Sequence, residues 1–174
     1  MTTSGWEGIL DDDEEILWQG RPDTKIALKP RNLAGAAFGL LFAGIALIWM
    51  IGAARAGSGA WPFGLIHFTF GAIFALGSIY LGAFRRNRSW YTLTNHRAFI
   101  ATDFPLIGKR LKSYPINKDT VLEYVDDEPA SIIFARQRKR SQNGGYYTVK
   151  IGFERIPNGR EVFHLFRQVQ DNSK

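Results

Sequence analysis

The side chains best suited to chemistry in this chain are its three histidines and a dense acidic run near the start. His67, His96 and His164 lie far apart and show no HExxH or related metal-ligand spacing. The run DDDEE at 11–15 lacks the glycine turn and the alternating ligand positions of a calcium-binding EF-hand loop. We therefore expect no metal site, and we interpret residues 1–13 as a solvated acidic tail.

Other catalytic signatures are missing from the sequence. It contains no GxSxG, no phosphate-binding P-loop and no GxGxxG. It contains no cysteine, which excludes disulfides and thiolate metal ligands. No local base or oxyanion motif stands beside a serine or threonine that could act as a nucleophile. The sequence therefore predicts a non-catalytic protein that uses no cofactor.

Basic side chains are the remaining chemical feature, because the chain carries a net charge of +6. The stretch ARQRKRSQNGG contains Arg136, Arg138, Lys139 and Arg140. Before a glycine turn, such a loop could hold phosphate groups or touch a membrane surface, and a solvated hairpin tip is the alternative. Lys109, Arg110 and Lys112 could add to the same positive field. Nucleic acid is not an expected partner, because the chain also contains segments typical of membrane proteins.

Two long apolar segments lie between the acidic start and these basic clusters. Residues 33–54 contain no charged side chain, and a helix of this length would be about 33 Å long, slightly more than a bilayer core. A second run, 61–84, is uncharged when His67 is neutral, and Pro62 suits a first helical turn. The pattern predicts two transmembrane helices. A cleaved signal peptide does not fit, because a long, partly acidic stretch precedes the first run.

The charges around these two segments predict their orientation. Basic residues flank the pair on the outer sides: Arg21, Lys25, Lys29 and Arg31 before it, and Arg85, Arg86, Arg88 and Arg97 after it. The connecting loop carries only Arg55. By the positive-inside rule both termini are cytoplasmic. Arg85, Arg86 and Arg88 are then either topology markers or a contact site for anionic lipid.

Small residues recur at a spacing of four within both apolar segments. They are Gly35, Gly39 and Ala43, then Gly71 with Ala75, and Ser78 with Gly82. This spacing predicts close packing of the two helices on each other, and self-association in the membrane is the alternative. His67 is the single ionisable side chain in either segment, and we interpret it as a neutral interfacial histidine, with a proton relay as the alternative.

Beyond Arg88 the apolar period changes from helical to two, which predicts β-strands. The expected strands are 90–94, 97–102, 110–114, 120–125, 131–136 and 146–153. Asn95-His96 is a tight hairpin connection, because asparagine tolerates the left-handed conformation that such turns need. The spacing of strands and turns predicts an antiparallel meander or small barrel.

A helical period returns near the end of the chain. The apolar stripe comprises Val162, Phe163, Leu165, Phe166 and Val169. Asn158 is a plausible N-cap, with Glu161 three residues later as in a capping box. We expect this amphipathic helix to close one end of the β-domain, and a helix on the membrane surface is the alternative.

A lone strand signal, residues 14–20, precedes the first apolar segment. A single strand cannot satisfy its own backbone hydrogen bonds. We therefore expect this strand to pair with the distal sheet, which makes the transmembrane hairpin an insertion between the first strand and the second.

These stretches resemble those of bacterial membrane proteins with a pleckstrin-homology-like (PH-like) domain. In that family a start like EEILWQGRP, which contains Trp18 here, precedes two spans. A motif like YxLTxxR, here Tyr91, Thr94 and Arg97, then opens the domain, and SYPINKDTVLEYV at 113–125 also fits the family pattern. The resemblance implies a fold of seven antiparallel strands closed by one C-terminal helix. It assigns no catalytic role to the motif residues.

Together these observations predict an α+β membrane protein. A two-helix transmembrane hairpin would carry a cytoplasmic PH-like β-barrel or sheet at 89–174, completed by the strand at 14–20. The expected function is non-catalytic: the domain recruits or organises protein partners, or copies of itself, at the inner membrane of a bacterium. The alternative is binding of anionic lipid headgroups by the basic loop 136–140.

Overall fold

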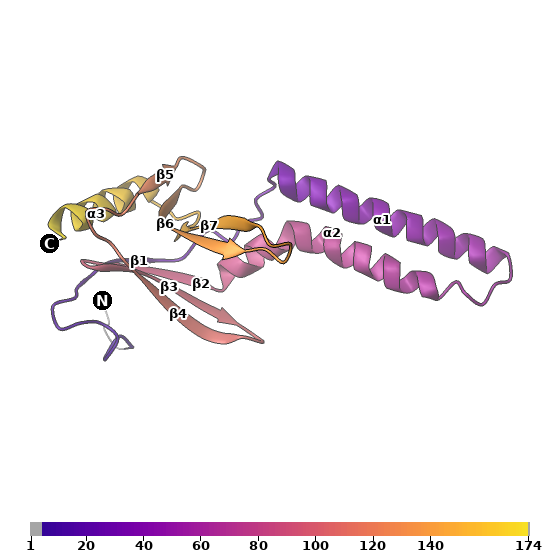
Figure 1. Cartoon of the computed structure of the whole chain (residues 1–174), viewed down its shortest axis with the longest axis horizontal. Helices are drawn as coiled ribbons and strands as arrows, with labels where there is room; N and C mark the ends of the chain where they lie inside the picture. Colours follow the sequence, from indigo (N-terminus) through magenta and orange to yellow (C-terminus); the bar gives the residue numbers. More distant parts are fainter. Residues whose placement is uncertain (1–4, 174) are drawn as a thin grey trace. The chain divides into compact units, whose positions relative to one another are not determined.

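A computed structural model describes residues 5–173 of the chain. The fold is α+β, with two long apolar helices, a shorter C-terminal helix and two antiparallel sheets (Figure 1). The chain forms two compact units. The first combines the residues up to Asp23 with those from Arg86 onward, and the second comprises Thr24–Arg85. The second unit is therefore an insertion into the first.

The second unit is a helical hairpin. Helix α1 spans Pro30–Arg55 and helix α2 spans Phe63–Asn87, and both are long and apolar enough to cross a membrane. Helix α1 begins three residues before the expected start because Pro30 fits the first helical position. Helix α2 continues beyond residue 84 into the arginine cluster, since arginine is a good helix former.

Small residues bring α1 and α2 into close contact along the hairpin (Figure 1). A Cβ atom added at Gly39 would lie 2.6 Å from the backbone nitrogen of Ala75, and one added at Gly71 would lie 2.8 Å from that of Ala43. Neither contact leaves room for a side chain. The repeat of small residues therefore packs the two helices on each other within one chain, the first of the two predicted alternatives. The ring of His67 lies beside Phe42 and Phe63, with Nδ1 3.4 Å from the Phe63 carbonyl oxygen.

Sheet A contains four strands in the order β1-β2-β3-β4. They are β1 (Ile16–Gly20), β2 (Ser89–Thr94), β3 (Arg97–Phe104) and β4 (Gly108–Pro115). Strand β1 pairs antiparallel with β2, with Gly20 opposite Tyr91. The strand that precedes α1 and the strand that follows α2 are therefore neighbours in one sheet, as the sequence predicted.

Sheet B contains β5 (Glu123–Val125), β6 (Ser131–Arg140) and β7 (Tyr146–Phe153) in that order. Strand β5 is shorter than expected, and β6 is longer. Residues 136–140, which the sequence analysis treated as a loop, continue β6 and pair with residues 146–150 of β7. Strand β6 is longer because the glycine turn at 144–145 is tight, so the strands on both sides of it stay paired up to Arg140 and Tyr146.

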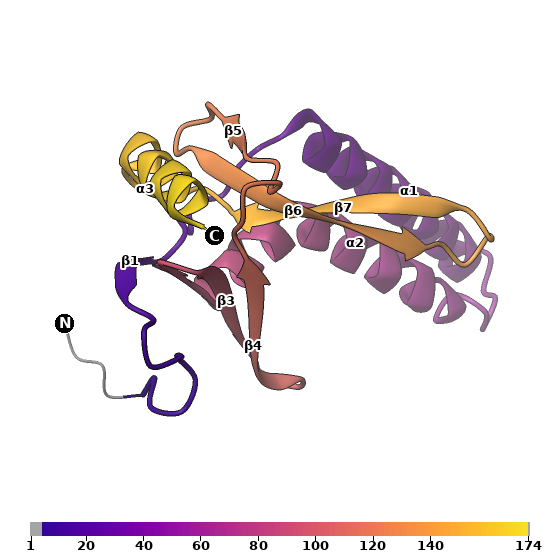
Figure 2. The same ribbon diagram turned by 60° about the vertical axis from the view of Figure 1, so that its left-hand side comes forward.

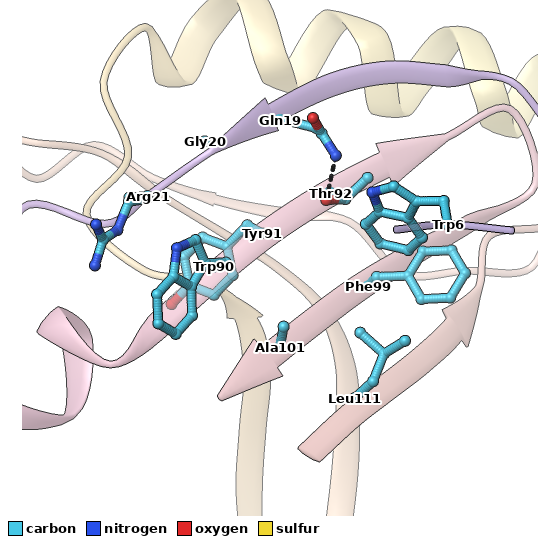
Figure 3. Close-up of a pocket in the computed structure, with 10 residues that line it drawn as sticks. All are labelled: Trp6, Gln19, Gly20, Arg21, Trp90, Tyr91, Thr92, Phe99, Ala101 and Leu111. Carbon is cyan, nitrogen blue, oxygen red and sulfur yellow. Dashed lines mark hydrogen bonds between the residues drawn. The ribbon is translucent and has the colours of Figure 1, made fainter. Parts of the chain in front are cut away.

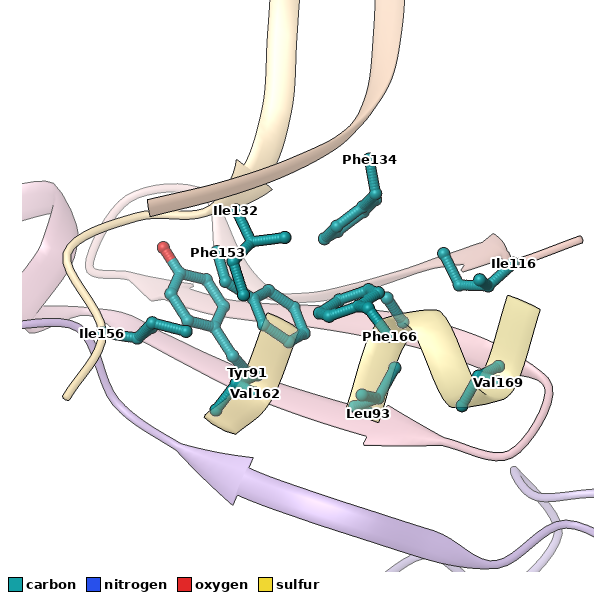
Figure 4. Packing of buried hydrophobic residues seen from close by; sticks show 11 residues of the cluster. Tyr91, Leu93, Ile116, Ile132, Phe134, Phe153, Ile156, Val162, Phe166 and Val169 are labelled. Atoms are coloured by element: carbon teal, nitrogen blue, oxygen red, sulfur yellow. The ribbon is translucent and has the colours of Figure 1, made fainter. Parts of the chain in front are cut away.

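The hydrophobic core lies among sheet A, sheet B and helix α3 (Gly159–Asn172) (Figure 4). Phe153 is its centre: its ring stacks on Tyr91 and contacts those of Phe134 and Phe166. The helix thus covers the β-domain, which is one of the two predicted alternatives. The expected capping box is not formed, because Asn158 adopts a left-handed conformation and its side chain makes no cap hydrogen bond.

Candidate functional site

A long β-hairpin carries the basic cluster at 136–140. Every residue of β6 from Arg136 to Arg140 is exposed, and β7 is exposed over residues 146–148. We call residues 136–150 the arm; Figure 2 shows it extending from sheet B as two paired strands and a turn. Its far part makes no contribution to the core, so its sequence is free to serve a surface role.

Strand register sorts the basic side chains of the arm onto two faces. Opposite residues of an antiparallel pair share a face, and neighbours along a strand alternate. Arg136 is opposite Lys150, and Arg138 and Arg140 follow on the same face. Lys139 lies on the other face, opposite Tyr147. One face of the arm therefore carries a row of three arginines and a lysine, which we call the basic face.

Only the inner residues of the basic face, Arg136 and Lys150, form ion pairs within the described part of the chain. Glu123 of β5 accepts hydrogen bonds from Lys150 at 2.6 Å and from Arg136 at 2.9 Å, and these bonds hold the pKa of Glu123 below its ordinary value. The guanidinium of Arg138 lies 4.2 Å from the ring centroid of Tyr146. Within the described residues, no carboxylate pairs with Arg138, Lys139 or Arg140. The outer part of the arm is therefore positive and accessible.

The arginines that follow the second apolar segment occupy different environments. Arg85 is exposed, Arg88 is half-buried, and Arg86 is only 9% exposed. The Arg86 Nε donates to the carbonyl oxygen of Asp23 at 2.8 Å. Arg155, in turn, forms an ion pair of 3.0 Å with the Asp23 carboxylate. Arg86 is thus part of the packing where the chain leaves and re-enters the first unit, so its surroundings differ from those of an exposed lipid-contact residue.

The residues of the YxLTxxR motif, and Trp18, make contacts that stabilise the fold. Tyr91 and Trp18 both pack on Phe153 in the core. Thr94, fully buried, donates to Glu14 Oε1 at 2.6 Å and accepts from the backbone nitrogen of Arg97 at 2.9 Å. The Nε of Arg97 donates to the same carboxylate at 3.1 Å, and its Nη2 forms an ion pair with it. Thr94 and Arg97 therefore hold a buried carboxylate.

Glu14 is the residue of this cluster that the sequence analysis missed. It belongs to the acidic run 11–15 and starts the strand expected at 14–20, and neither feature indicated that its side chain would have no exposed area. Burial raises the pKa of Glu14, but hydrogen bonds from Arg97, Thr94 and the Asp11 backbone outweigh it and hold the pKa below its ordinary value. The strand itself begins two residues later than expected, at Ile16, so Glu14 precedes β1.

Asn95 also binds the N-terminal segment. It accepts a hydrogen bond from the backbone nitrogen of Glu15 at 2.9 Å and donates to the carbonyl oxygen of Asp13 at 2.9 Å. Farther along the same segment, Trp6 packs edge-on against Phe99, with ring centroids 5.2 Å apart. The segment is thus attached to the outer face of sheet A by polar contacts at one end and an aromatic contact at the other.

A shallow groove of about 420 Å³ lies on this outer face (Figure 3). Trp6 and Trp90 bound it, and Thr92 and Phe99 form part of its floor. At the Trp90 end, the guanidinium of Arg21 lies 4.7 Å from the Trp90 ring. An apolar groove of this kind with one stacked cation suits a mixed apolar and anionic surface rather than a reaction centre.

No protein-family model, no curated protein and no solved structure matches this chain. Over residues 5–173, no group of three or more His, Cys, Asp or Glu side chains is placed to hold a metal ion. Among the described surfaces, the arm combines an extended exposed hairpin with a row of basic side chains.

Proposed function

We propose that this protein is a non-catalytic, membrane-anchored interaction module of the PH-like type. Helices α1 and α2 would span a bacterial inner membrane, with both termini in the cytoplasm. The arm would dock an extended acidic segment of a protein partner. Seven antiparallel strands followed by a helix packed on the core support the PH-like assignment, and the uncharged lengths of α1 and α2 support the anchor.

The observation that carries the proposal is the combination of charge and open backbone on the arm. Strand β7 is the last strand of sheet B, and within residues 5–173 it pairs with β6 alone. An open strand edge offers backbone donors and acceptors to an extended peptide, and this mode of recognition is called β-augmentation. Arg138 and Arg140 would attract carboxylates beside that edge. A lipid headgroup would use only the charges, so the open edge favours a protein ligand.

The direct test is photo-crosslinking in native membranes. In one variant of the full chain a photoreactive amino acid replaces Thr148 on β7. In a control variant of the same chain it replaces Val121, an exposed residue outside the arm. A discrete protein adduct from position 148, absent from position 121, is the expected result. Mass spectrometry then identifies the partner, including a second copy of this chain. Adducts with lipid alone would contradict the proposal.

Charge reversal tests the basic face with a matched control inside the arm. Arg138→Glu with Arg140→Glu reverses two charges on the basic face, whereas Lys139→Glu with Gln137→Glu alters the other face. The first pair is expected to abolish the position-148 adduct, and the second pair to retain most of it. Equal losses from both pairs would show that general charge, as in attraction to anionic lipid, governs binding.

A further inference from the structure

The β3–β4 hairpin ends in an exposed apolar tip. Leu106 is 99% exposed and Ile107 is 57% exposed, at the turn between Phe104 and Gly108. A turn of this kind normally carries polar residues, because each exposed leucine or isoleucine leaves apolar area in water. Basic residues follow the tip directly: Lys109, Arg110 and Lys112. Apolar residues with adjacent cations are the combination that an anionic membrane surface attracts.

Strand register places this tip at one particular end of sheet A. Helix α2 ends at Asn87 and β2 begins at Ser89, so the chain enters the sheet there. Strand β3 runs antiparallel to β2, and Ser89 is opposite Thr102. Only Asp103 and Phe104 separate Thr102 from the turn, a distance of about 7 Å in extended chain. The tip therefore lies at the end of the sheet where the chain arrives from α2.

Other residues at this end continue the same chemistry. Trp90, Ala101 and Leu111 are opposite one another on three neighbouring strands, and therefore share a face. Trp90 is 37% exposed and Leu111 is 43% exposed. Arg21 stacks on Trp90 (Figure 3). It also donates to the carbonyl oxygen of Asn87 at 2.9 Å. Tryptophan beside arginine is typical of the boundary between a membrane and water.

We propose that this end of sheet A is a membrane-contact surface, with the side chains of Leu106 and Ile107 inserted at the headgroup level. The contact surface comprises Trp90, Leu106, Ile107 and Leu111, with Arg21, Lys109 and Arg110 as the cations that meet anionic lipid. The inference rests on the proposed anchoring of the chain by α1 and α2. It adds a second attachment that fixes the orientation of the β-domain against the bilayer.

The absence of cysteine allows a specific test on the full chain. Leu106→Cys carries an environment-sensitive fluorophore, and the protein is reconstituted in phosphatidylcholine vesicles with or without phosphatidylglycerol. Val121→Cys is the aqueous control, and Leu47→Cys in α1 reports on the anchor. We expect position 106 to show a blue-shifted emission and to be quenched by a quencher attached near the lipid headgroup, and position 121 to show neither effect.

The outcomes separate this inference from the proposed anchor. Water-like emission at position 106, with lipid-like emission at 47, would overturn the contact surface and leave the anchor intact. Water-like emission at both positions would overturn the anchor as well. A blue shift at 106 without lipid quenching would mean that protein covers the tip, which also contradicts the proposal. Lys109→Glu with Arg110→Glu should reduce quenching at 106 in the vesicles that contain phosphatidylglycerol.

Discussion

Glu14 is the carboxylate that the YxLTxxR motif binds. Its carboxylate is buried and receives hydrogen bonds from Thr94 and Arg97, two residues of the YxLTxxR pattern. A buried carboxylate needs such partners, since an unpaired charge in the protein interior is strongly unfavourable. The motif therefore joins the N-terminal segment to the turn between β2 and β3, and its conspicuous arginine has a stabilising role.

Arg97→Leu should destabilise the folded domain. The substitution leaves Glu14 buried without its charged donor, and the expected loss in the free energy of unfolding is about 2–3 kcal/mol, typical of hydrogen bonds to charged groups. Thermal unfolding of the full chain in detergent, followed by tryptophan fluorescence, measures the effect. Arg160→Leu, at an exposed position of α3, is the matched control and should change stability by less than about 0.5 kcal/mol. Equal stability of the two variants would contradict the assigned role.

The same carboxylate predicts a dependence of stability on pH. The pKa of Glu14 is lower in the folded state than its ordinary value of 4.5. Its stabilising contribution is therefore complete above pH 4.5 and is lost as the pH falls through the folded-state pKa, because the unfolded state binds the proton more tightly. Glu14→Gln should flatten this part of the curve. Thermal melts of both proteins between pH 6 and pH 3 provide the comparison, and parallel curves would contradict the prediction.

The sequence identified one half of this interaction and missed the other. Tyr91, Thr94 and Arg97 are conspicuous because they form a motif, and Trp18 because it lies in an isolated strand. Glu14 starts the same expected strand, but its residue type does not distinguish it from the neighbouring carboxylates, which are exposed. Which member of an acidic run is buried depends on the register of β1 against β2, and that register is a tertiary property.

At the scale of elements, the close contact between α1 and α2 depends on Gly39 and Gly71. Gly39→Leu would place a side chain against the backbone of α2, whereas Gly44 has no neighbouring atom within 4 Å of an added Cβ. We expect Gly39→Leu to weaken the hairpin by about 1–3 kcal/mol through overpacking, and Gly44→Leu to have little effect. Energy transfer between dyes on introduced cysteines at the open end of the hairpin, during a titration with SDS, measures the separation of the helices. Similar titration curves for the two variants would contradict this packing.

Element types were predictable from the sequence, but several boundaries were not, and the largest change for the candidate site is in β6. Apolar length identified the two helices of the hairpin, and alternation identified the strands. The strand at 146–153 was predicted, but the extension of β6 over 136–140 was missed because arginine and lysine side chains hide the alternation that normally indicates a strand. Residues 136–140 remain extended through backbone pairing with 146–150, which residue type does not reveal.

At the scale of the whole chain, the two residues of the first unit between which the α1–α2 hairpin is inserted are in contact. Arg86 Nε donates to the Asp23 carbonyl oxygen, and both residues belong to the first unit. The backbone nitrogen of Asp23 in turn donates to the carbonyl oxygen of Arg155 at 2.7 Å. These bonds, all within the first unit, hold together the two residues between which the hairpin is inserted. This arrangement explains how one domain can be assembled from segments more than sixty residues apart in sequence.

Because Asp23 and Arg86 are in contact, replacing residues 24–85 by a short glycine-serine linker should give a soluble, folded domain. Closing so short a loop has a small entropic cost, and the core around Phe153 is drawn from the first unit alone. Limited proteolysis and the dispersion of amide NMR signals measure folding. Deleting residues 1–20 from the same protein is the informative contrast, because it removes β1, Glu14 and Trp18 and exposes the edge of β2. We expect that deletion to abolish the protease resistance of residues 89–173. A linker protein that is as protease-sensitive as the deletion would show that the domain requires its hairpin to fold.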